Sequence, residues 1–386
     1  MPVITVGGTN GKGSTCALLE CMLLGAGHRV GLYTSPHLID YNERVRIDGR
    51  PASDEALCDA FACVEAARGD TPLTYFEFGT LAAWQAFSAA GVDAVILEVG
   101  LGGRLDAVNV FDADCAVVTT VDLDHMDYLG DTREAIGFEK AGIFRAGRPA
   151  IVGDAQAPQS LLDHAHSIGA DLQVLGRDFG YLAEPGQWTF WSRRGRRGGL
   201  AHPALRGVIQ LANASTAIAA LEALQERLPV TMQDIRRGLA EVALPGRFQV
   251  IPGRPTVVLD VAHNPQAASV LADNLGCMAF HPETWAVFGM LADKDIRGVI
   301  ERLRNRIDRW LVATLPGPRG TGAAELAKLL EERGCRVDGC FDSPAQAWRA
   351  AQGRAGENDR IVTFGSFLTV AGVLQAIDDE RKRRTT

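Results

Sequence analysis

Short apolar runs alternate with longer amphipathic segments in the first half of the chain. Strands that are covered by helices on both faces are almost continuously apolar. Three runs have this character, at residues 3–6, 92–99 and 114–121. Helical patterns lie between them, at residues 15–25, 53–68, 74–90 and 131–144. This alternation predicts a mostly parallel α/β sheet flanked by helices, with ligands bound outside the carboxyl ends of its strands.

The second half of the chain changes character twice. Residues 179–199 read as a β-hairpin region with a solvated basic run, and a helix is expected at 210–226. Proline and glycine then concentrate in LPGRFQVIPGRP, which separates a helix from a new strand. Strands and helices alternate again beyond it. We therefore predict two domains, a P-loop domain at 1–245 and a smaller Rossmann-like α/β domain at 246–386.

Charge and composition restrict the kinds of partner and the cellular location that we expect. The chain has 386 residues, a formal net charge of -8 and a pI near 5.6, which argues against a nucleic-acid partner and favours a small substrate. It shows neither a signal sequence nor a membrane-spanning run, so it reads as cytoplasmic. Its eight cysteines lack zinc-site spacing and are expected to be buried, reduced thiols.

The stretch GGTNGKGST follows the first predicted strand and opens the first predicted helix. Successive backbone N–H groups, a helix N-terminus and a lysine together bind phosphates, so this loop predicts a nucleoside triphosphate site. Its spacing departs from the usual P-loop pattern, and a tight structural turn is the alternative. A GTPase is disfavoured because the guanine-reading N-K-x-D is absent. The VGLGGRLDA stretch matches a dinucleotide fingerprint only partly, since Leu105 replaces its third glycine.

Three polar residues follow predicted strands and could hold the magnesium ion that accompanies a nucleotide. Ser35 follows GLYT, Glu98 ends VILE, and His125 follows VTTVDLD. Carboxylate, hydroxyl and imidazole groups are all metal ligands in proteins. Glu98 could instead cap the next turn, and His125 could be a hydrogen-bonded loop residue.

Ten motifs spread over the whole chain resemble the folylpolyglutamate synthase/dihydrofolate synthase enzymes of the Mur ligase superfamily. They are GTNGKGST, LYTSPHL, YFEFGTLAA, EVGLGGRLDA, LDHMDYLG, EKAGIFR, LPGRF, DVAHNP, GMLADKD and FGSFLTVA. Members of this family usually carry a further segment before the first strand, part of which helps to bind the pterin. Here the sequence opens at MPVITV.

The resemblance implies ATP-dependent amide bond formation through an acyl phosphate. The amino group of L-glutamate would join the carboxylate of dihydropteroate or of a reduced folate, releasing ADP and phosphate. We expect a monomer that binds only these small molecules. The alternatives are a cell-wall amino-acid ligase of the Mur type and a non-catalytic nucleotide-binding protein.

The resemblance also implies residue roles. The phosphates of ATP would contact Thr9, Asn10, Gly11 and Lys12, with Gly13 and Ser14 in the same loop, and the nucleotide would also contact Asn213, Arg247 and Asp260. The magnesium ligands would be Ser35, Glu98 and His125. The pterin would face Thr74, Leu105, Asp106 and Ala107.

Two further residues are expected to take part in catalysis. The resemblance implies that Lys140 is the carbamylated lysine of the family, and a carbamate would attract a metal ion that an ammonium group would repel. Its alternative is an ion pair with Glu139 or another carboxylate. His263 would face the cleft, or else it only precedes a helix that starts at Asn264-Pro265.

Overall fold

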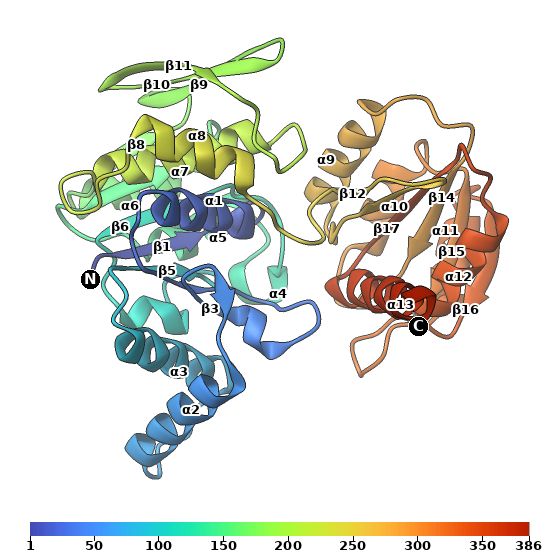
Figure 1. Ribbon diagram of the computed structural model, residues 1–386, viewed down its shortest axis with the longest axis horizontal. Helices are drawn as coiled ribbons and strands as arrows, with labels where there is room; N and C mark the ends of the chain where they lie inside the picture. Colours follow the sequence, from blue (N-terminus) through green and yellow to red (C-terminus); the bar gives the residue numbers. More distant parts are fainter. Residues whose placement is uncertain (386) are drawn as a thin grey trace. The chain divides into compact units, whose positions relative to one another are not determined.

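The computed structural model describes residues 1–385, which form two compact units (Figure 1). The first unit comprises Met1–Ala204 and Ile209–Ala243. The second comprises Leu205–Val208 and the chain from Leu244 onward. Each unit has its own sheet and its own apolar core.

The first unit is built on an eight-stranded sheet in the order β4-β3-β2-β5-β1-β6-β7-β8. The six strands from β2 to β8 in this order run parallel, which matches the predicted mostly parallel sheet. The hairpin β3–β4 at one edge is antiparallel and was not predicted. The strands are β1 Val3–Gly7, β2 Val30–Tyr33, β3 Val45–Ile47, β4 Arg50–Pro51, β5 Ala94–Glu98, β6 Cys115–Val118, β7 Pro149–Val152 and β8 Asp171–Val174.

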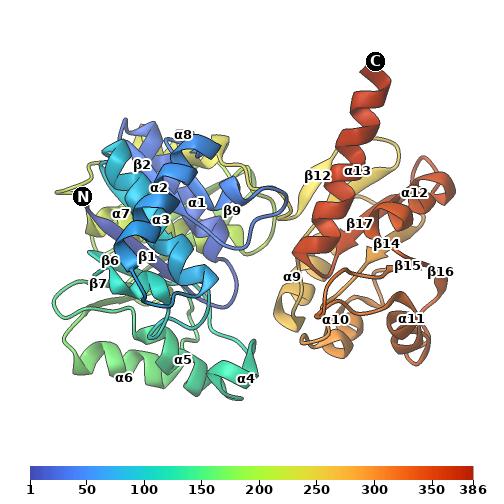
Figure 2. The same ribbon diagram turned by 90° about the horizontal axis from the view of Figure 1, so that it is seen from below.

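Helices cover both faces of this sheet (Figures 1 and 2). One face carries α1 Lys12–Gly25, α7 Gln210–Ala223 and α8 Met232–Glu241, and α7 and α8 both pack on α1. The other carries α2 Asp54–Arg68, α3 Tyr75–Ala90, α5 Arg133–Ala141 and α6 Gln159–Ser167. Short connections contain the 3-10 helices η1 Tyr41–Arg44 and η2 Ala107–Val110, and the single turn α4 Met126–Leu129. Side-chain caps from Ser53, Thr74 and Thr132 fix the starts of α2, α3 and α5.

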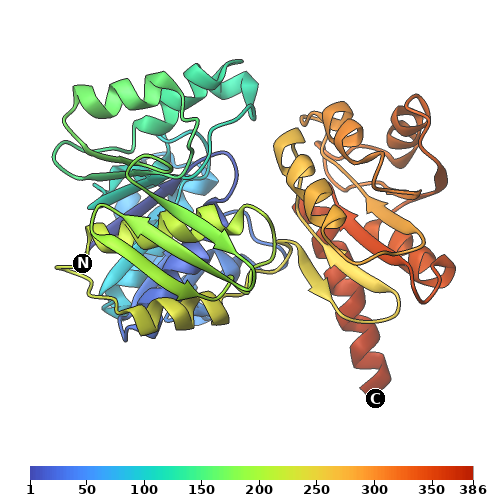
Figure 3. The same ribbon diagram turned by 90° about the horizontal axis from the view of Figure 1, so that it is seen from above.

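The predicted hairpin region is a three-stranded antiparallel sheet in the order β11-β10-β9. It consists of β9 Phe179–Glu184, β10 Gln187–Ser192 and β11 Gly195–Leu200, and it lies against α7 (Figures 1 and 3). Arg193, Arg194 and Arg196 of the basic run are exposed, as expected, whereas Arg197 is half-buried. Arg193 pairs with Asp178 at 2.7 Å, and Arg197 donates at 2.7 Å to the buried Glu222, because a buried carboxylate requires a partner.

The second unit contains a six-stranded sheet in the order β12-β13-β17-β14-β15-β16, parallel except for β12. Its strands are β12 Gln249–Ile251, β13 Thr256–Leu259, β14 Thr284–Phe288, β15 Arg309–Ala313, β16 Val337–Phe341 and β17 Arg360–Phe364. Its helices are α9 Pro265–Gly276, α10 Ile296–Leu303, α11 Ala323–Glu331, α12 Pro344–Arg354 and α13 Phe367–Thr385. The first three share one core, and α12 packs with α13. The far end of α13 extends past the rest of this unit (Figure 2).

The structure bears on two expectations, that the cysteines are buried and that the chain has no membrane-spanning run. The cysteines are free thiols, but only Cys16 and Cys115 are buried, whereas Cys58, Cys63, Cys277 and Cys340 are exposed. The expectation of uniformly buried thiols was therefore wrong, because α2 carries two of these cysteines on its outer face. None of the helices in residues 1–385 is both long enough and apolar enough to span a membrane.

Candidate active site

The glycine loop lies at the carboxyl end of β1, a central strand, and leads directly into α1. Gly11 precedes α1 with a φ of 91°, and Gly8 has a φ of 138°. Both values are rare for residues with a side chain. A β-carbon at Gly8 would stand 1.9 Å from Thr119 Oγ1, and one at Gly11 would stand 2.7 Å from Asn213 Oδ1. Only glycine therefore fits at these two positions, and the loop leads into a helix N-terminus of the kind that binds anions in other proteins.

Lys12, the first residue of α1, folds back over the loop. Its ammonium group donates to the carbonyl oxygens of Gly8 at 3.0 Å and Thr9 at 3.4 Å. This holds a positive charge at the helix N-terminus, where phosphate oxygens would lie. Ser14 is almost fully buried in the first turn of the helix.

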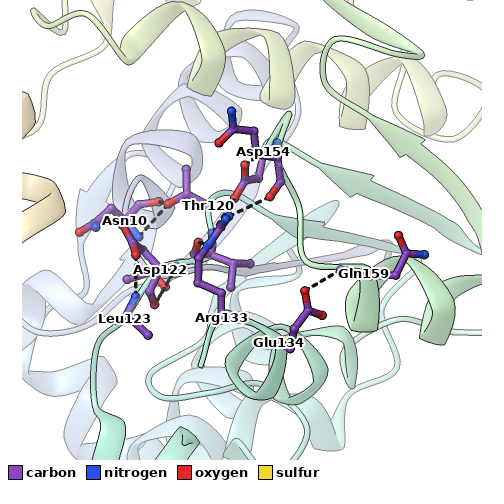
Figure 4. Close-up of polar contacts among 11 residues, drawn as sticks. Asn10, Thr120, Asp122, Leu123, Arg133, Glu134, Asp154 and Gln159 are labelled. Atoms are coloured by element: carbon purple, nitrogen blue, oxygen red, sulfur yellow. Dashed lines mark hydrogen bonds and ion pairs between the residues drawn. The ribbon is translucent and has the colours of Figure 1, made fainter. Parts of the chain in front are cut away.

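A second loop, which follows β6, supports the glycine loop through side-chain hydrogen bonds. Thr9 Oγ1 donates to the Asp122 carbonyl oxygen at 3.1 Å and accepts from the Asp122 amide at 3.0 Å. The Asn10 amide donates to Thr120 Oγ1 at 3.2 Å, as Figure 4 shows, and Thr119 Oγ1 donates to the Asn10 carbonyl oxygen at 2.7 Å. These hydrogen bonds fix the position of the glycine loop relative to the loop after β6.

The same second loop is anchored from α5 by Arg133 (Figure 4). Its guanidinium donates to the Val121 carbonyl oxygen at 2.9 Å and to Asp154 at 3.2 Å. Asp154 in turn accepts from the Val121 amide at 3.0 Å. The chain that leads to His125 is therefore held from both sides.

Of the predicted metal ligands, Glu98 and Ser35 lie at the ends of β5 and β2, whereas His125 lies further along the loop after β6, directly before α4. Glu98, the last residue of β5, is only 4% exposed, and its Oε2 accepts from the Ser35 amide at 3.3 Å. These two residues are therefore neighbours. His125 has a left-handed backbone with a φ of 52° and lies 3.9 Å from Asp124. Within residues 1–385, no group of three or more His, Cys, Asp or Glu side chains is arranged as a metal site. The oxygen donors of Ser35 and Glu98 suit a hard divalent cation.

Lys140 is buried near the end of α5, with 4% of its surface exposed. Burial, followed by the charge on Lys12, lowers the pKa of Lys140 to about 7, although Asp124 and Asp106 act in the opposite direction. Glu139 pairs instead with Arg104 at 2.9 Å. The alternative of a Lys140–Glu139 ion pair is therefore wrong, and Lys140 lies within electrostatic range of the glycine-loop lysine.

The loop between β5 and η2 begins after Glu98 and packs against α5, the helix that carries Lys140. Asp106 caps η2 and accepts from the Leu101 amide at 2.8 Å, and burial raises its pKa. A β-carbon at Gly103 would stand 2.9 Å from the Glu139 carbonyl oxygen, so this loop passes close against α5. Ala107 starts η2, whereas Leu105 is 80% exposed.

Thr74 lies elsewhere, at the start of α3. Its side chain accepts from the Glu77 amide at 3.3 Å, so it is the cap of that helix. It also lines a cavity of about 540 Å³ whose walls include the rings of Tyr41, Phe61, Tyr75 and Phe78. None of the lining residues comes from the Leu105–Ala107 stretch. The four predicted pterin residues therefore do not share this cavity.

The remaining predicted residues divide between the units. Asn213, on α7, contacts the glycine loop at Gly11.

In the second unit, Asp260 follows β13 and accepts from the Phe248 and Ala262 amides, both at 2.8 Å. Desolvation raises the pKa of Asp260, and Arg247 opposes this rise. His263 Nδ1 lies 2.8 Å from the Val261 carbonyl oxygen, just before the Asn264 cap of α9. The predicted helix start at Asn264-Pro265 is confirmed, and the functional roles stay predictions.

Sequence reasoning missed the residues that support the site from outside the motifs. These are Thr119, Thr120, Arg133 and Asp154, whose contacts with the two loops are described above. Asp154 follows β7 after a single glycine, so its place after an apolar run was an available signal. Nothing in the sequence pairs Arg133 with it.

Comparisons with known families agree with this architecture. The family model described as "Mur ligase middle domain" matches residues 6–221, and the model described as "Mur ligase, glutamate ligase domain" matches residues 246–367. The dihydrofolate synthase/folylpolyglutamate synthase of Escherichia coli (strain K12) is 48% identical over 98% of this chain and 87% of its own length. The Haemophilus influenzae protein of the same name is 44% identical, over 96% of this chain and 87% of its own.

Solved structures extend the likeness to three dimensions. E. coli FolC in complex with DHPP and ADP has a TM-score of 0.94 at 47% identity, covering 98% of this chain and 89% of its own. The Yersinia pestis bifunctional enzyme complexed with AMPPNP and Mn has a TM-score of 0.92 at 47% identity, with the same two coverages. With both Mur ligase regions matched and 48% identity over almost its whole length, the chain belongs to the dihydrofolate synthase/folylpolyglutamate synthase family of Mur ligases.

Proposed function

We propose that this protein is an ATP-dependent ligase that joins L-glutamate to dihydropteroate, to reduced folates or to both. One structural observation carries the proposal. The glycine loop with Lys12 and the buried Glu98 both lie at the carboxyl end of one parallel sheet, and the buried Lys140 lies within electrostatic range of Lys12. The carboxyl end is the one at which α/β proteins bind their ligands. The relatives reported above bear the name of this activity.

The glycine loop supplies the ATP phosphate site in this proposal. Thr9, Asn10, Gly11, Gly13 and Ser14 form its cradle, and Lys12 holds a positive charge beside it. Asn213, in contact with Gly11, is assigned to the nucleotide as well. Positioning and charge neutralisation are what phosphoryl transfer chiefly requires, so no side-chain nucleophile is needed.

The reaction has two steps. An oxygen of the acceptor carboxylate attacks the γ-phosphorus of ATP, and the bond to the bridging oxygen breaks, which gives an acyl phosphate and ADP. The neutral amino nitrogen of L-glutamate then attacks the acyl carbon. A C–N bond forms, the C–O bond to phosphate breaks, and the nitrogen loses a proton. Negative charge accumulates near Lys12 in the first step, where a fixed cation lowers the barrier.

Ser35, Glu98 and His125 are proposed to hold magnesium, and the adjacency of Ser35 to Glu98 supports this. When bound, magnesium would neutralise phosphate charge. Two solved relatives contain Mn with AMPPNP, one of them also with L-glutamate. A manganese-binding relative at 47% identity favours a divalent cation here.

We assign a carbamylated side chain to Lys140. Its pKa of about 7 leaves a large neutral fraction at neutral pH, and only a neutral amine can add to carbon dioxide. The modification would also replace the repulsion between Lys140 and Lys12 by attraction.

For the acceptor, the aromatic cavity beside Thr74 is the best candidate in the first unit for a flat ring system. Aromatic walls with a few polar groups are typical of small-molecule sites. Leu105, Asp106 and Ala107 remain assigned to the acceptor, where the 80% exposed Leu105 offers an apolar contact.

The test is glutamate-dependent ADP release with magnesium, with dihydropteroate and tetrahydrofolate as separate acceptors. We expect ADP release that requires both L-glutamate and one of the acceptors. ADP release with a cell-wall precursor instead would favour a cell-wall amino-acid ligase of the Mur type. ATP binding without turnover under all conditions would favour a non-catalytic nucleotide-binding protein.

A further inference from the structure

Among the arginines of the first unit without a carboxylate partner, Arg44 is the one that is half-buried, whereas Arg50, Arg194, Arg196 and Arg236 are exposed. Arg46, Arg104 and Arg133 each pair with an acid, at 3.0, 2.9 and 3.2 Å. Across the described residues, no carboxylate lies within ion-pair distance of the Arg44 guanidinium. A half-buried guanidinium without a counter-charge costs folding free energy, which a bound anion would recover.

The guanidinium of Arg44 is held in a fixed orientation. Its Nε donates to His37 Nδ1 at 2.8 Å. Its central carbon lies 5.6 Å from the ring centroid of Tyr41 and 5.4 Å from that of Tyr75. Cation–π contacts of this kind stabilise the charge without satisfying its N–H groups. The Tyr33 hydroxyl also lies beside the guanidinium. A neutral hydroxyl does not balance the charge, so the terminal nitrogens can still offer a carboxylate the fork that binds it through two hydrogen bonds.

The position of Arg44 connects it to both parts of the candidate active site. Its carbonyl oxygen accepts from the Thr34 amide at 2.9 Å, directly before Ser35. His37, its acceptor, lies two residues after Ser35 in the same loop. Tyr41 and Tyr75, its ring neighbours, line the cavity that contains Thr74. Arg44 thus lies between the proposed metal loop and the proposed acceptor cavity.

The loop around Arg44 is also rigid. Glu43 accepts from three successive amides, those of Leu38 at 2.7 Å, Ile39 at 2.8 Å and Asp40 at 2.9 Å. The rings of Tyr41 and Tyr75 contact each other with centroids 6.0 Å apart. A preorganised cation loses little entropy when it binds its ligand.

We propose that Arg44 binds a substrate carboxylate that does not react, either on the incoming L-glutamate or on the glutamate tail of a folate acceptor. This inference rests on the proposed function. The two sources share one chemistry, and the acceptors distinguish them. Dihydropteroate has one carboxylate, the one that reacts, whereas a folate has a further carboxylate on its glutamate tail.

The test compares steady-state kinetics of the wild type with Arg44→Met and Arg44→Lys. Arg50→Met is the matched control, because Arg50 is an exposed arginine on the neighbouring strand β4. We expect Arg44→Met to raise the KM of one carboxylate substrate roughly 10- to 100-fold, the value of a charged hydrogen-bond pair. The KM of ATP should not change. Arg44→Lys should have an intermediate KM, because it keeps the charge and loses the fork.

The pattern of KM changes identifies the source. A higher KM for L-glutamate with both acceptors would assign Arg44 to the incoming amino acid. A higher KM for tetrahydrofolate, with an unchanged KM for dihydropteroate, would assign it to the folate tail. An unchanged KM for all three substrates, or a loss in kcat that Arg44→Lys does not relieve, would overturn the inference. A wild type without glutamate-dependent ADP release would instead remove the proposed function.

Discussion

Replacement of Lys140 gives the sharpest test of the proposed chemistry. The side chain is 4% exposed, and burial, followed by the charge on Lys12, lowers its pKa to about 7. A lysine with its ordinary pKa is about 0.03% neutral at pH 7, whereas a pKa near 7 makes about half of it neutral. This is a rise of roughly 10³-fold in the form that can attack carbon dioxide.

The neutral amine of Lys140 attacks carbon dioxide, an N–C bond forms as one C=O double bond opens, and the nitrogen releases one proton, so a neutral side chain becomes an anion; a protonated Lys140 must first lose a further proton. We expect Lys140→Ala to lower kcat by roughly 10²- to 10³-fold, the usual loss when one electrostatic group of an active site is removed. Short-chain carboxylic acids should restore part of the activity, since they bring an anion into the space that is left. Activity should also fall below about pH 7, where the amine becomes protonated.

The assay has two independent readouts, glutamate-dependent ADP release and a carbamate signal in ¹³C NMR after addition of ¹³C-bicarbonate. The signal should be present in the wild type and in Lys328→Ala, where an exposed lysine of the second unit is replaced, and absent in Lys140→Ala. Full activity of Lys140→Ala, together with a wild type that gives no carbamate signal, would refute the reasoning.

Three further predictions concern the glycine loop, the metal site and the loop after β6. Lys12→Ala should abolish ATP turnover without lowering the thermal unfolding temperature, because the ammonium bonds only to its own loop; unchanged turnover would reject its role. Glu98→Gln should raise the magnesium concentration needed for half-maximal ADP release, and an unchanged requirement would remove Glu98 from the metal site. Arg133→Met should leave Asp154 without its cation and raise the KM of ATP by roughly 10-fold, as for the loss of one charged hydrogen bond. An unchanged KM of ATP would show that the loop after β6 keeps its position without Arg133.

The sequence predicted the elements whose signals are local. The glycine loop needs only a strand, a run of small residues and a helix, all within 25 residues of the start. The α/β alternation likewise depends on periodicity within each segment. The antiparallel hairpin β3–β4 was missed although Asp48-Gly49 is a strong hairpin signal, and both residues have a positive φ, of 52° and 77°.

The residues that support the site could not be predicted, because their roles depend on the order of strands in the sheet. Thr119 and Thr120 bond to the glycine loop only because β6 lies beside β1, about 110 positions away in sequence. The lack of a carboxylate beside Arg44 could not be predicted either, since only the folded chain shows which arginines have a carboxylate nearby.

The central claim is that this protein activates an acceptor carboxylate as an acyl phosphate before L-glutamate attacks. Dihydropteroate or tetrahydrofolate labelled with ¹⁸O in the reacting carboxylate tests it directly. The account predicts that one ¹⁸O atom appears in the released phosphate for each amide bond formed. Amide formation with unlabelled phosphate would contradict it.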